Sequence, residues 1–166
     1  MPVAYLGLGS NLNPEQNLQL ALREIGARFS LRNFSPVYRS KALGFEGADF
    51  LNAVACIETA MTPSGLCREL DLIHELAGRR RRPEKYVSRT LDIDLLLYDQ
   101  LVLNEGRIRL PRSDVLQYSF VLKPLADIAP DYRHPVSGKL IIDHWREFDA
   151  GSHPLTKVDS NMLERT

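Results

Sequence analysis

The sequence predicts an α+β fold, and three observations support this. Along the first hundred residues the hydrophobic period alternates between two and 3.6, in the order strand, helix, strand, strand, helix, strand. The chain has 166 residues, enough for one hydrophobic core, and its 44% hydrophobic and 25% charged residues are ordinary for a globular protein. Strong start signals precede both helices. This order predicts a ferredoxin-like βαββαβ core with an antiparallel sheet, helices packed on it, and a C-terminal extension.

The first strand is predicted over residues 3–8, where apolar residues alternate. A helix follows, because Asn13, Pro14 and Gln16 supply a capping residue, a first-turn proline and a partial capping box. Its buried stripe comprises Leu18, Leu20, Ala21, Ile25 and Phe29.

The middle of the chain predicts two strands, over residues 31–40 and 50–59, and a second helix. This helix begins with Thr62 before a proline and ends at Gly78, where a left-handed stop is natural. The last core strand runs from Thr90 to residue 98. Beyond it the extension is predicted to hold short helices, over residues 113–118, 120–128 and 141–148. We expect one domain over residues 1–150 and a flexible polar tail over residues 151–166.

The positive charge of the chain is local. Lysines and arginines balance aspartates and glutamates, 21 against 21, yet residues 79–89 alone hold six cations and one carboxylate. A small anionic ligand fits this distribution better than nucleic acid, whose partners usually have an overall basic balance. The sequence has no run of about 18 apolar residues, so we expect no membrane segment and a cytoplasmic protein. Cys56 and Cys67 are isolated and expected to stay reduced.

The strand from Thr90 carries two carboxylates. Its alternation is expected to place Leu91, Ile93, Leu95 and Leu97 on one face and Asp92 and Asp94 together on the other. A rise of about 3.3 Å per residue holds the two carboxylates roughly 6–7 Å apart. They would repel each other unless water or a cation compensates, and Mg²⁺ suits such oxygen ligands because it completes its shell with water and phosphates.

The basic loop directly upstream supplies partners for those phosphates. Only Thr90 and Leu91 separate Arg89 from Asp92, and the planar guanidinium group of arginine binds phosphate oxygens well. Alone, the four-arginine run from Arg79 to Arg82 would be read as a solvated patch or a weak nucleic-acid contact. Beside the aspartates it predicts a site for a metal-bound polyphosphate.

The segment R-T-L-D-I-D-L-L-L-Y, preceded by G-R-x-R, resembles the fingerprint of 6-hydroxymethyl-7,8-dihydropterin pyrophosphokinases, and the resemblance covers roughly residues 1–148. It implies a folate-pathway transferase that moves pyrophosphate from ATP to the hydroxymethyl group of 6-hydroxymethyl-7,8-dihydropterin, giving AMP and the pterin diphosphate. It also implies ATP as co-substrate, two Mg²⁺ ions, small-molecule partners only, and a monomer.

The resemblance assigns roles residue by residue. In the family two aromatic rings enclose the pterin and an asparagine reads its polar edge, places that Phe50, Phe120 and Asn52 take here, while Leu43 and Gly44 match the loop lining the pocket. Asp92 and Asp94 match the magnesium ligands. The implied catalytic arginines are Arg79 and Arg89, and the implied ATP contacts are Arg81, Tyr86, Arg107 and Arg112.

Several positions depart from the family pattern. A usual glutamate is His74, and a usual arginine is Tyr118. The other departures are Tyr86, Val87, Ser88 and Arg112. They leave open a divergent paralogue acting on or binding another pterin. A small RNA-binding module is a third hypothesis, disfavoured because no strand has the aromatic-rich motif of RNA-binding sheets. The four histidines, His74, His134, His144 and His153, show no ligand spacing, and we expect them in surface or loop positions.

Overall fold

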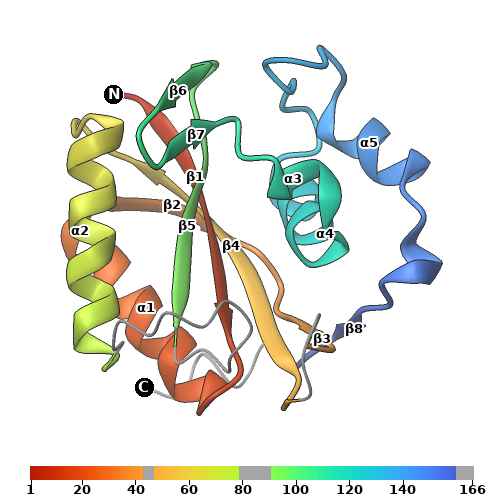
Figure 1. Cartoon of the computed structure of the whole chain (residues 1–166), viewed down its shortest axis with the longest axis horizontal. Helices are drawn as coiled ribbons and strands as arrows, with labels where there is room; N and C mark the ends of the chain where they lie inside the picture. The colour runs from red at the N-terminus through yellow and green to blue at the C-terminus, as the bar shows by residue number, and fades with distance from the viewer. Residues whose placement is uncertain (43–46, 79–90, 160–166) are drawn as a thin grey trace.

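The computed structural model describes residues 1–42, 47–78 and 91–159. In these residues one antiparallel sheet lies between two layers of helices (Figure 1). The strands of this sheet are β1 (Val3–Ser10), β2 (Ser30–Phe34), β3 (Tyr38–Ser40), β4 (Phe50–Glu58), β5 (Asp92–Tyr98) and β8 (Thr156–Lys157). Their order is β5–β1–β4–β3–β8, with β2 also paired to β4. The prediction of a ferredoxin-like core with a C-terminal addition is confirmed.

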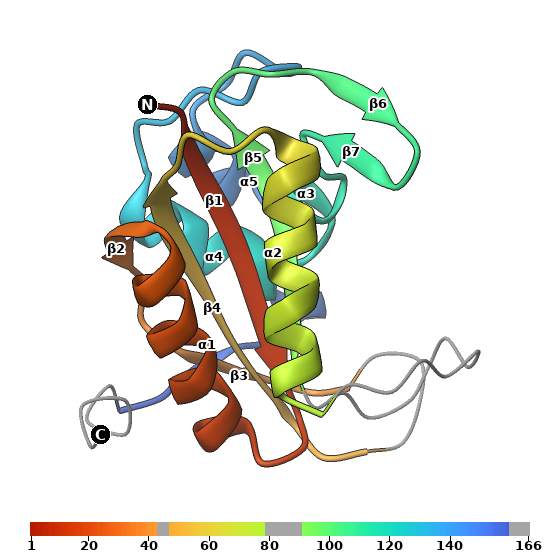
Figure 2. The same ribbon diagram turned by 90° about the vertical axis from the view of Figure 1, so that its left-hand side faces the viewer.

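The first helical layer consists of α1 (Pro14–Arg28) and α2 (Pro63–Leu76), which cover one face of the sheet (Figure 2). The larger core cluster lies under them, because every second residue of β1 points to these helices. Its members of β1, α1 and α2 with at most 3% exposure include Ala4, Leu6, Leu8, Leu18, Ile25, Leu66 and Ile73.

The helix start predicted at Thr62 is confirmed in detail, and the one at Asn13 only in position. The Thr62 hydroxyl accepts a hydrogen bond from the Gly65 amide at 3.2 Å, and Gly78 has the predicted left-handed backbone. Asn13 is left-handed, with φ of 46°, and makes no side-chain cap, because capping geometry needs an extended residue. Asn17 instead donates from Nδ2 to the carbonyl of Leu12 at 2.6 Å.

The single strand predicted over residues 31–40 is wrong, because it is broken into β2 and β3. Pro36 has no N–H group for a ladder, and the break falls at this residue. Ser35 secures the crossing: its amide donates to the Val54 carbonyl at 2.9 Å, and its hydroxyl accepts from the Val54 amide at 2.8 Å.

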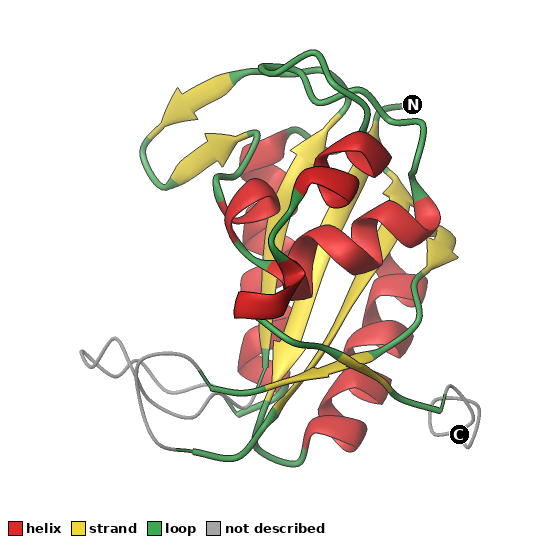
Figure 3. Ribbon diagram, turned by 90° about the vertical axis from the view of Figure 1, so that its right-hand side faces the viewer, coloured by secondary structure: helices red, strands yellow, loops and turns green. Residues whose placement is uncertain are grey.

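The second helical layer packs on the opposite face of the sheet (Figure 3). It consists of α3 (Asp114–Gln117), α4 (Ser119–Ile128) and α5 (Ile141–Glu147), so three short helices occupy the predicted region. A second core cluster joins α4 to the sheet and includes Val54, Leu96, Leu97, Leu122 and Leu125.

Leu97 was predicted to share a face with Ile93, which is wrong. The register of β5 on β1 shifts between Leu95, which pairs with Leu6, and Leu97, which pairs with Tyr5. This irregularity inserts one residue and turns Leu97 into the second core. As a result, the last part of β5 is buried on both faces, while the part that carries the two aspartates is half-buried.

The chain after α5 returns to the sheet. The short 3-10 helix η1 (Ala150–Ser152) leads to β8, which pairs with β3 at the sheet edge. The Val158 amide donates to the Val37 carbonyl at 2.8 Å. Ser119 on α4 also donates to the carbonyl of His153 at 2.7 Å. The described part of the predicted polar tail therefore adds a strand to the sheet. Among the described residues, no helix has the length and apolar character needed to cross a membrane.

Candidate active site

The site is built on a row of residues that crosses three strands. Gly9 on β1 pairs with Asp92 on β5 and with Asn52 on β4, so both polar side chains flank it on the same face. Strands lie about 4.8 Å apart, which places the backbone of Asp92 about 10 Å from that of Asn52. Two residues further along the strands, and therefore on the same face, Gly7 pairs with Asp94.

The two glycines of β1 have different roles on this face of the sheet. A Cβ atom on Gly7 would lie 3.2 Å from both terminal carbons of buried Leu96, so Gly7 makes room for the core. A Cβ atom on Gly9 would lie 3.4 Å from Asn52 Oδ1 and 4.0 Å from Phe50 Cδ1, which is ordinary contact. Gly9 therefore leaves a bare patch of backbone between Asn52, Phe50 and the carboxylates.

Asn52 is buried and held rigidly. Its Nδ2 donates to the Ser40 hydroxyl at 2.8 Å and to the Tyr38 carbonyl at 3.2 Å, both on β3. The predicted pterin residues Phe50 and Asn52 are thus brought together at the start of β4. Phe120 comes from the second helical layer, where it lies in the first turn of α4. Its ring stacks on Tyr118 with centroids 5.0 Å apart.

Asp94 lies beside a cationic side chain, that of Arg112. Arg112 Nη2 is 3.6 Å from Asp94 Oδ1, and Arg112 Nε is 3.3 Å from Asp114 Oδ1. The Arg112 backbone amide donates to the Leu96 carbonyl at 2.9 Å, which fixes the main chain of Arg112 beside β5. Burial lowers the pKa of Arg112, but the carboxylates of Asp94, Asp114 and Asp92 outweigh this effect and raise the pKa above its usual value.

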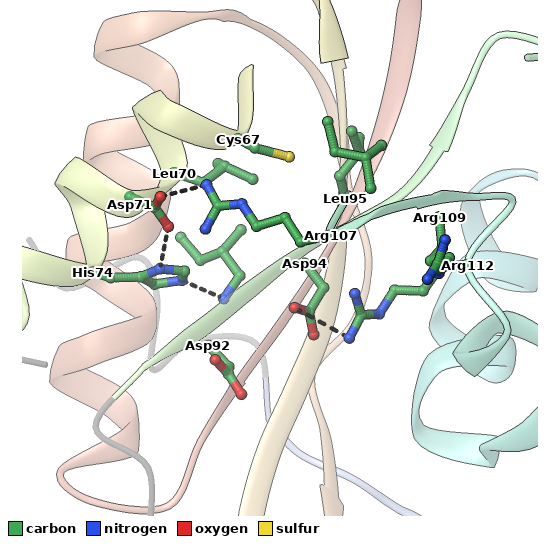
Figure 4. Close-up of a pocket in the computed structure, with 12 residues that line it drawn as sticks. Cys67, Leu70, Asp71, His74, Asp92, Asp94, Leu95, Arg107, Arg109 and Arg112 are labelled. Atoms are coloured by element: carbon green, nitrogen blue, oxygen red, sulfur yellow. Dashed lines mark hydrogen bonds and ion pairs between the residues drawn. The ribbon is translucent and has the colours of Figure 1, made fainter. Parts of the chain in front are cut away.

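A pocket of about 180 Å³ opens between α2, the start of β5 and a hairpin (Figure 4). The hairpin pairs β6 (Leu103–Glu105) with β7 (Ile108–Leu110), and it supplies Arg107 and Arg109 to the pocket. This volume is below the roughly 300–1,000 Å³ of pockets that enclose a drug-sized ligand. The described residues therefore form a compartment for part of a ligand, with arginines and aspartates on its walls.

Arg107, a predicted ATP contact, stands at the rim of this pocket. It lies at the hairpin turn, is 62% exposed, and donates from Nη2 to Asp71 Oδ2 on α2 at 2.5 Å. That hydrogen bond raises the pKa of Arg107. The guanidinium group is held at the pocket rim and remains open to solvent on its other side.

His74 was predicted at the surface or in a loop, and this is wrong. It is a helical residue with a side chain only 8% exposed, and its Nε2 accepts a hydrogen bond from the Ile93 amide at 2.8 Å. A sequence signal was present, because His74 lies four residues after Leu70 in the buried stripe of α2. Asp71, one turn earlier, also escaped the sequence analysis, as did Arg109, which lies two residues after Arg107 on the same hairpin.

The donor set on β5 fits a magnesium ion. Among the described residues, no group of three or more histidine, cysteine, aspartate or glutamate side chains could hold a metal. Mg²⁺ does not need such a cage, because it is usually bound through one or two carboxylates with waters and substrate phosphates completing the shell. Asp92 and Asp94, on one face beside glycines, meet that requirement.

Several predicted site residues lie outside the described residues, and their roles stay predictions. They are Leu43, Gly44, Arg79, Arg81, Tyr86 and Arg89.

The fold and the site together define a class of small α+β protein with a ferredoxin-like sheet, whose paired carboxylates and neighbouring guanidinium groups suit an anionic ligand bound with a metal. Comparison with known proteins makes this specific. The sequence pattern of the 7,8-dihydro-6-hydroxymethylpterin-pyrophosphokinase (HPPK) family matches residues 5–130. The chain belongs to this family, which confirms the resemblance found in the sequence.

Individual relatives agree over nearly the whole chain. A 2-amino-4-hydroxy-6-hydroxymethyldihydropteridine pyrophosphokinase of Methylorubrum extorquens is 39% identical, over 99% of each chain. The protein of the same name from Haemophilus influenzae is 37% identical, over 96% of this chain and 99% of its own. Among solved structures, Plasmodium falciparum HPPK-DHPS with pterin and p-hydroxybenzoate superposes with a TM-score of 0.73 at 14% identity. This chain spans 43% of that longer protein, and 88% of its own length is covered.

Proposed function

We propose that this site transfers the pyrophosphoryl group of ATP to the hydroxymethyl group of 6-hydroxymethyl-7,8-dihydropterin, giving AMP and the pterin diphosphate. The observation that carries the proposal is the row Asp92–Gly9–Asn52. It places a carboxylate suited to magnesium and an amide suited to a pterin edge on one face, about 10 Å apart across bare backbone.

The pterin ring is proposed to lie over Gly9, between Phe50 and Phe120. The bond network on Asn52 supports this, because Nδ2 is already committed to Tyr38 and Ser40. Asn52 Oδ1, which faces the space above Gly9, is then available to accept a hydrogen bond from a ring N–H or amino group. With the ring held there, its hydroxymethyl group points along the row toward Asp92.

The phosphates of ATP are proposed to lie along β5 and the hairpin. Magnesium held by Asp92 and Asp94 would neutralise phosphate charge and acidify the attacking hydroxyl. The guanidinium group of Arg112 lies 3.6 Å from Asp94, so it is close enough to contact an oxygen of a phosphate bound beside that carboxylate. Arg107 is proposed to contact the nucleotide from the rim, with Arg81, Arg112 and Tyr86 as further contacts.

The transfer itself needs charge stabilisation more than a strong protein base. Phosphoryl-type transfer passes through a loose transition state with its charge spread over the phosphoryl oxygens. Preorganised cations around that charge are therefore the main contribution of the protein, and the predicted catalytic arginines, Arg79 and Arg89, join Arg112 in it. The proton of the attacking pterin hydroxyl group can pass to water or to an aspartate oxygen.

The test is a product assay. The protein is incubated with ATP, Mg²⁺ and 6-hydroxymethyl-7,8-dihydropterin, and the nucleotides and pterins are separated by chromatography. We expect AMP and pterin diphosphate in equal amounts from the wild type, with product formed roughly 10²-fold more slowly, or slower still, by Asp92→Asn or Asp94→Asn. Asp131→Asn, on an exposed loop after α4, is the matched control and should turn over normally. ADP as the nucleotide product, or turnover only with another pterin, would contradict the proposal.

We also propose two magnesium ions per site, a monomeric protein and a cytoplasmic location. ATP as co-substrate and two free cysteines support the location. Titration of Mg²⁺ in the presence of a non-hydrolysable ATP analogue and light scattering test the first two points, and fractionation of cells tests the third. One metal per site, or a stable dimer, would correct them.

A further inference from the structure

His74 links the edge of the sheet to the rim of the pocket. Strand β5 has β1 on one side, and in the described sheet no strand on the other. The Ile93 amide, between the two aspartates, therefore needs an acceptor that the sheet does not supply, and His74 Nε2 supplies it at 2.8 Å.

The other ring nitrogen faces a second group of the site. Because Nε2 accepts from an N–H, the proton of the neutral ring is on Nδ1. Nδ1 lies 3.7 Å from Asp71 Oδ1, and Asp71 Oδ2 holds Arg107 Nη2 at 2.5 Å (Figure 4). We call Ile93, His74, Asp71 and Arg107 the His74 network. It connects the strand segment of the metal carboxylates to a cation on the hairpin.

The network has an inner arm, the hydrogen bond between His74 and Ile93, and an outer arm, the contacts from His74 through Asp71 to Arg107. The two arms differ in burial. The side chain of His74 is 8% exposed, while those of Asp71 and Arg107 are 45% and 62% exposed. An exposed ion pair adds little stability, so the outer arm can orient Arg107 without holding the fold together. The inner hydrogen bond is buried, and its loss would leave a donor unsatisfied beside the carboxylates.

We infer that His74 is a positioning residue: it fixes the segment of β5 that presents Asp92 and Asp94 and, through Asp71, the direction of Arg107. This inference deepens the proposed function and rests on it for its kinetic consequences. His74 itself acts through its neighbours and need not touch either substrate.

The inner arm is tested without substrate. Hydrogen exchange of the Ile93 amide and the ring ¹⁵N spectrum are measured on the protein free of metal and nucleotide. Wild type should show the Nδ1-protonated tautomer, and His74→Leu should raise the exchange rate at Ile93 by tenfold or more, roughly the loss of one buried acceptor. His74→Gln should restore slow exchange, because the amide oxygen of glutamine can replace Nε2 as acceptor. An Nε2-protonated ring, or unchanged exchange in His74→Leu, would overturn the inference.

The effect of His74 and Asp71 on function is tested by the binding of Mg²⁺ and a non-hydrolysable ATP analogue, and by separate measurement of kcat and KM. His74→Leu should weaken Mg²⁺-dependent nucleotide binding by about tenfold or more, and His74→Gln should recover most of it. Asp71→Asn should raise the KM for ATP several-fold without changing exchange at Ile93. His144→Leu, which replaces a histidine on α5, is the control and should change neither nucleotide binding nor exchange at Ile93.

The outcomes distinguish a failure of the role inferred for His74 from a failure of the proposed function. If His74→Leu speeds exchange at Ile93 but binds Mg²⁺ and nucleotide normally, His74 is only structural and the inference fails. If wild type binds no nucleotide with Mg²⁺, the proposed function fails, while the exchange and tautomer results still report on the inner arm.

Discussion

The two glycines on the site face of β1 are predicted to give opposite phenotypes when changed to alanine. At Gly7 the new Cβ atom would lie 3.2 Å from both Cδ atoms of Leu96, a side chain that is 1% exposed and packed in the second core cluster. Overpacking costs about 1–3 kcal/mol, offset by about 0.4–1 kcal/mol from the stiffer unfolded chain. Gly7→Ala should therefore lower the free energy of unfolding by about 1 kcal/mol, and Tm by about 2–4 °C.

At Gly9 the same change should spare the fold and damage binding. Its Cβ atom would meet Asn52 Oδ1 at 3.4 Å and Phe50 Cδ1 at 4.0 Å, both ordinary contacts. The methyl group would stand where the pterin ring is proposed to lie, and such a misfit costs about 1–3 kcal/mol. We expect the KM for the pterin to rise by roughly fivefold to 150-fold, with stability equal or slightly higher and nucleotide binding unchanged.

Urea unfolding and steady-state kinetics with each substrate varied in turn measure both effects. Gly26→Ala on α1 is the matched control, because no atom lies within 4 Å of its new Cβ, so it should change neither pterin KM nor nucleotide KM. A normal pterin KM in Gly9→Ala would refute the placement of the ring over Gly9. A raised pterin KM with unchanged stability in Gly7→Ala would show that the two roles are exchanged.

Three further predictions concern other groups of the site. Asp92→Asn and Asp94→Asn should each lower kcat by roughly 10²-fold or more without unfolding the protein, as measured by product assay and circular dichroism. Asn52→Ala should lower the free energy of unfolding by about 1–3 kcal/mol, because the Tyr38 carbonyl and the Ser40 hydroxyl lose their buried donor, and it should also raise the KM for the pterin. Burial raises the pKa of the Cys67 thiol, so alkylation should be slower than for a free thiol at pH 7.5, should accelerate as pH rises, and should be slowed further by ATP with Mg²⁺.

Each of these has a result that would count against it. Near-normal kcat in both aspartate variants would remove the metal assignment. An Asn52→Ala protein as stable as wild type would mean that the bonds to β3 contribute nothing. Alkylation of Cys67 at the same rate with and without nucleotide would place the phosphates elsewhere than in the pocket that Cys67 lines.

Much of this fold was predictable because its signals are local. The alternation in β1, the cap at Thr62 and the stop at Gly78 each depend on a few neighbouring residues, and all three are confirmed. The spacing of Asp92 and Asp94 likewise follows from strand geometry alone, so the sequence places them together before any packing is known.

The errors arise where distant segments decide the outcome. The face of Leu97 depends on the irregular pairing of β5 with β1, where Leu96 packs closely against Gly7. No spacing within β5 reveals it. The break at Pro36 had a local signal, the missing N–H group, that the hydrophobic pattern outweighed.

His74 shows a third kind of error, in which residue type was weighed without position. Histidines without ligand spacing are commonly exposed, but this one occupies a buried place in the stripe of α2. Its partner is a backbone amide of an edge strand, and only the tertiary structure shows that this donor has no strand to bond.

The pairing of β8 with β3 has a practical consequence for anyone who shortens or extends this protein. The Tyr38 carbonyl accepts a hydrogen bond from Asn52, and Tyr38 also pairs with Lys157 on β8. The last described strand is therefore linked through Tyr38 to the side chain that is proposed to bind the pterin. Removing residues 154–166 would expose the β3 edge of the sheet and loosen the side-chain amide of Asn52, which is proposed to bind the pterin. Affinity tags and fusion partners are therefore better attached before Met1, at the opposite end of β1 from Gly9.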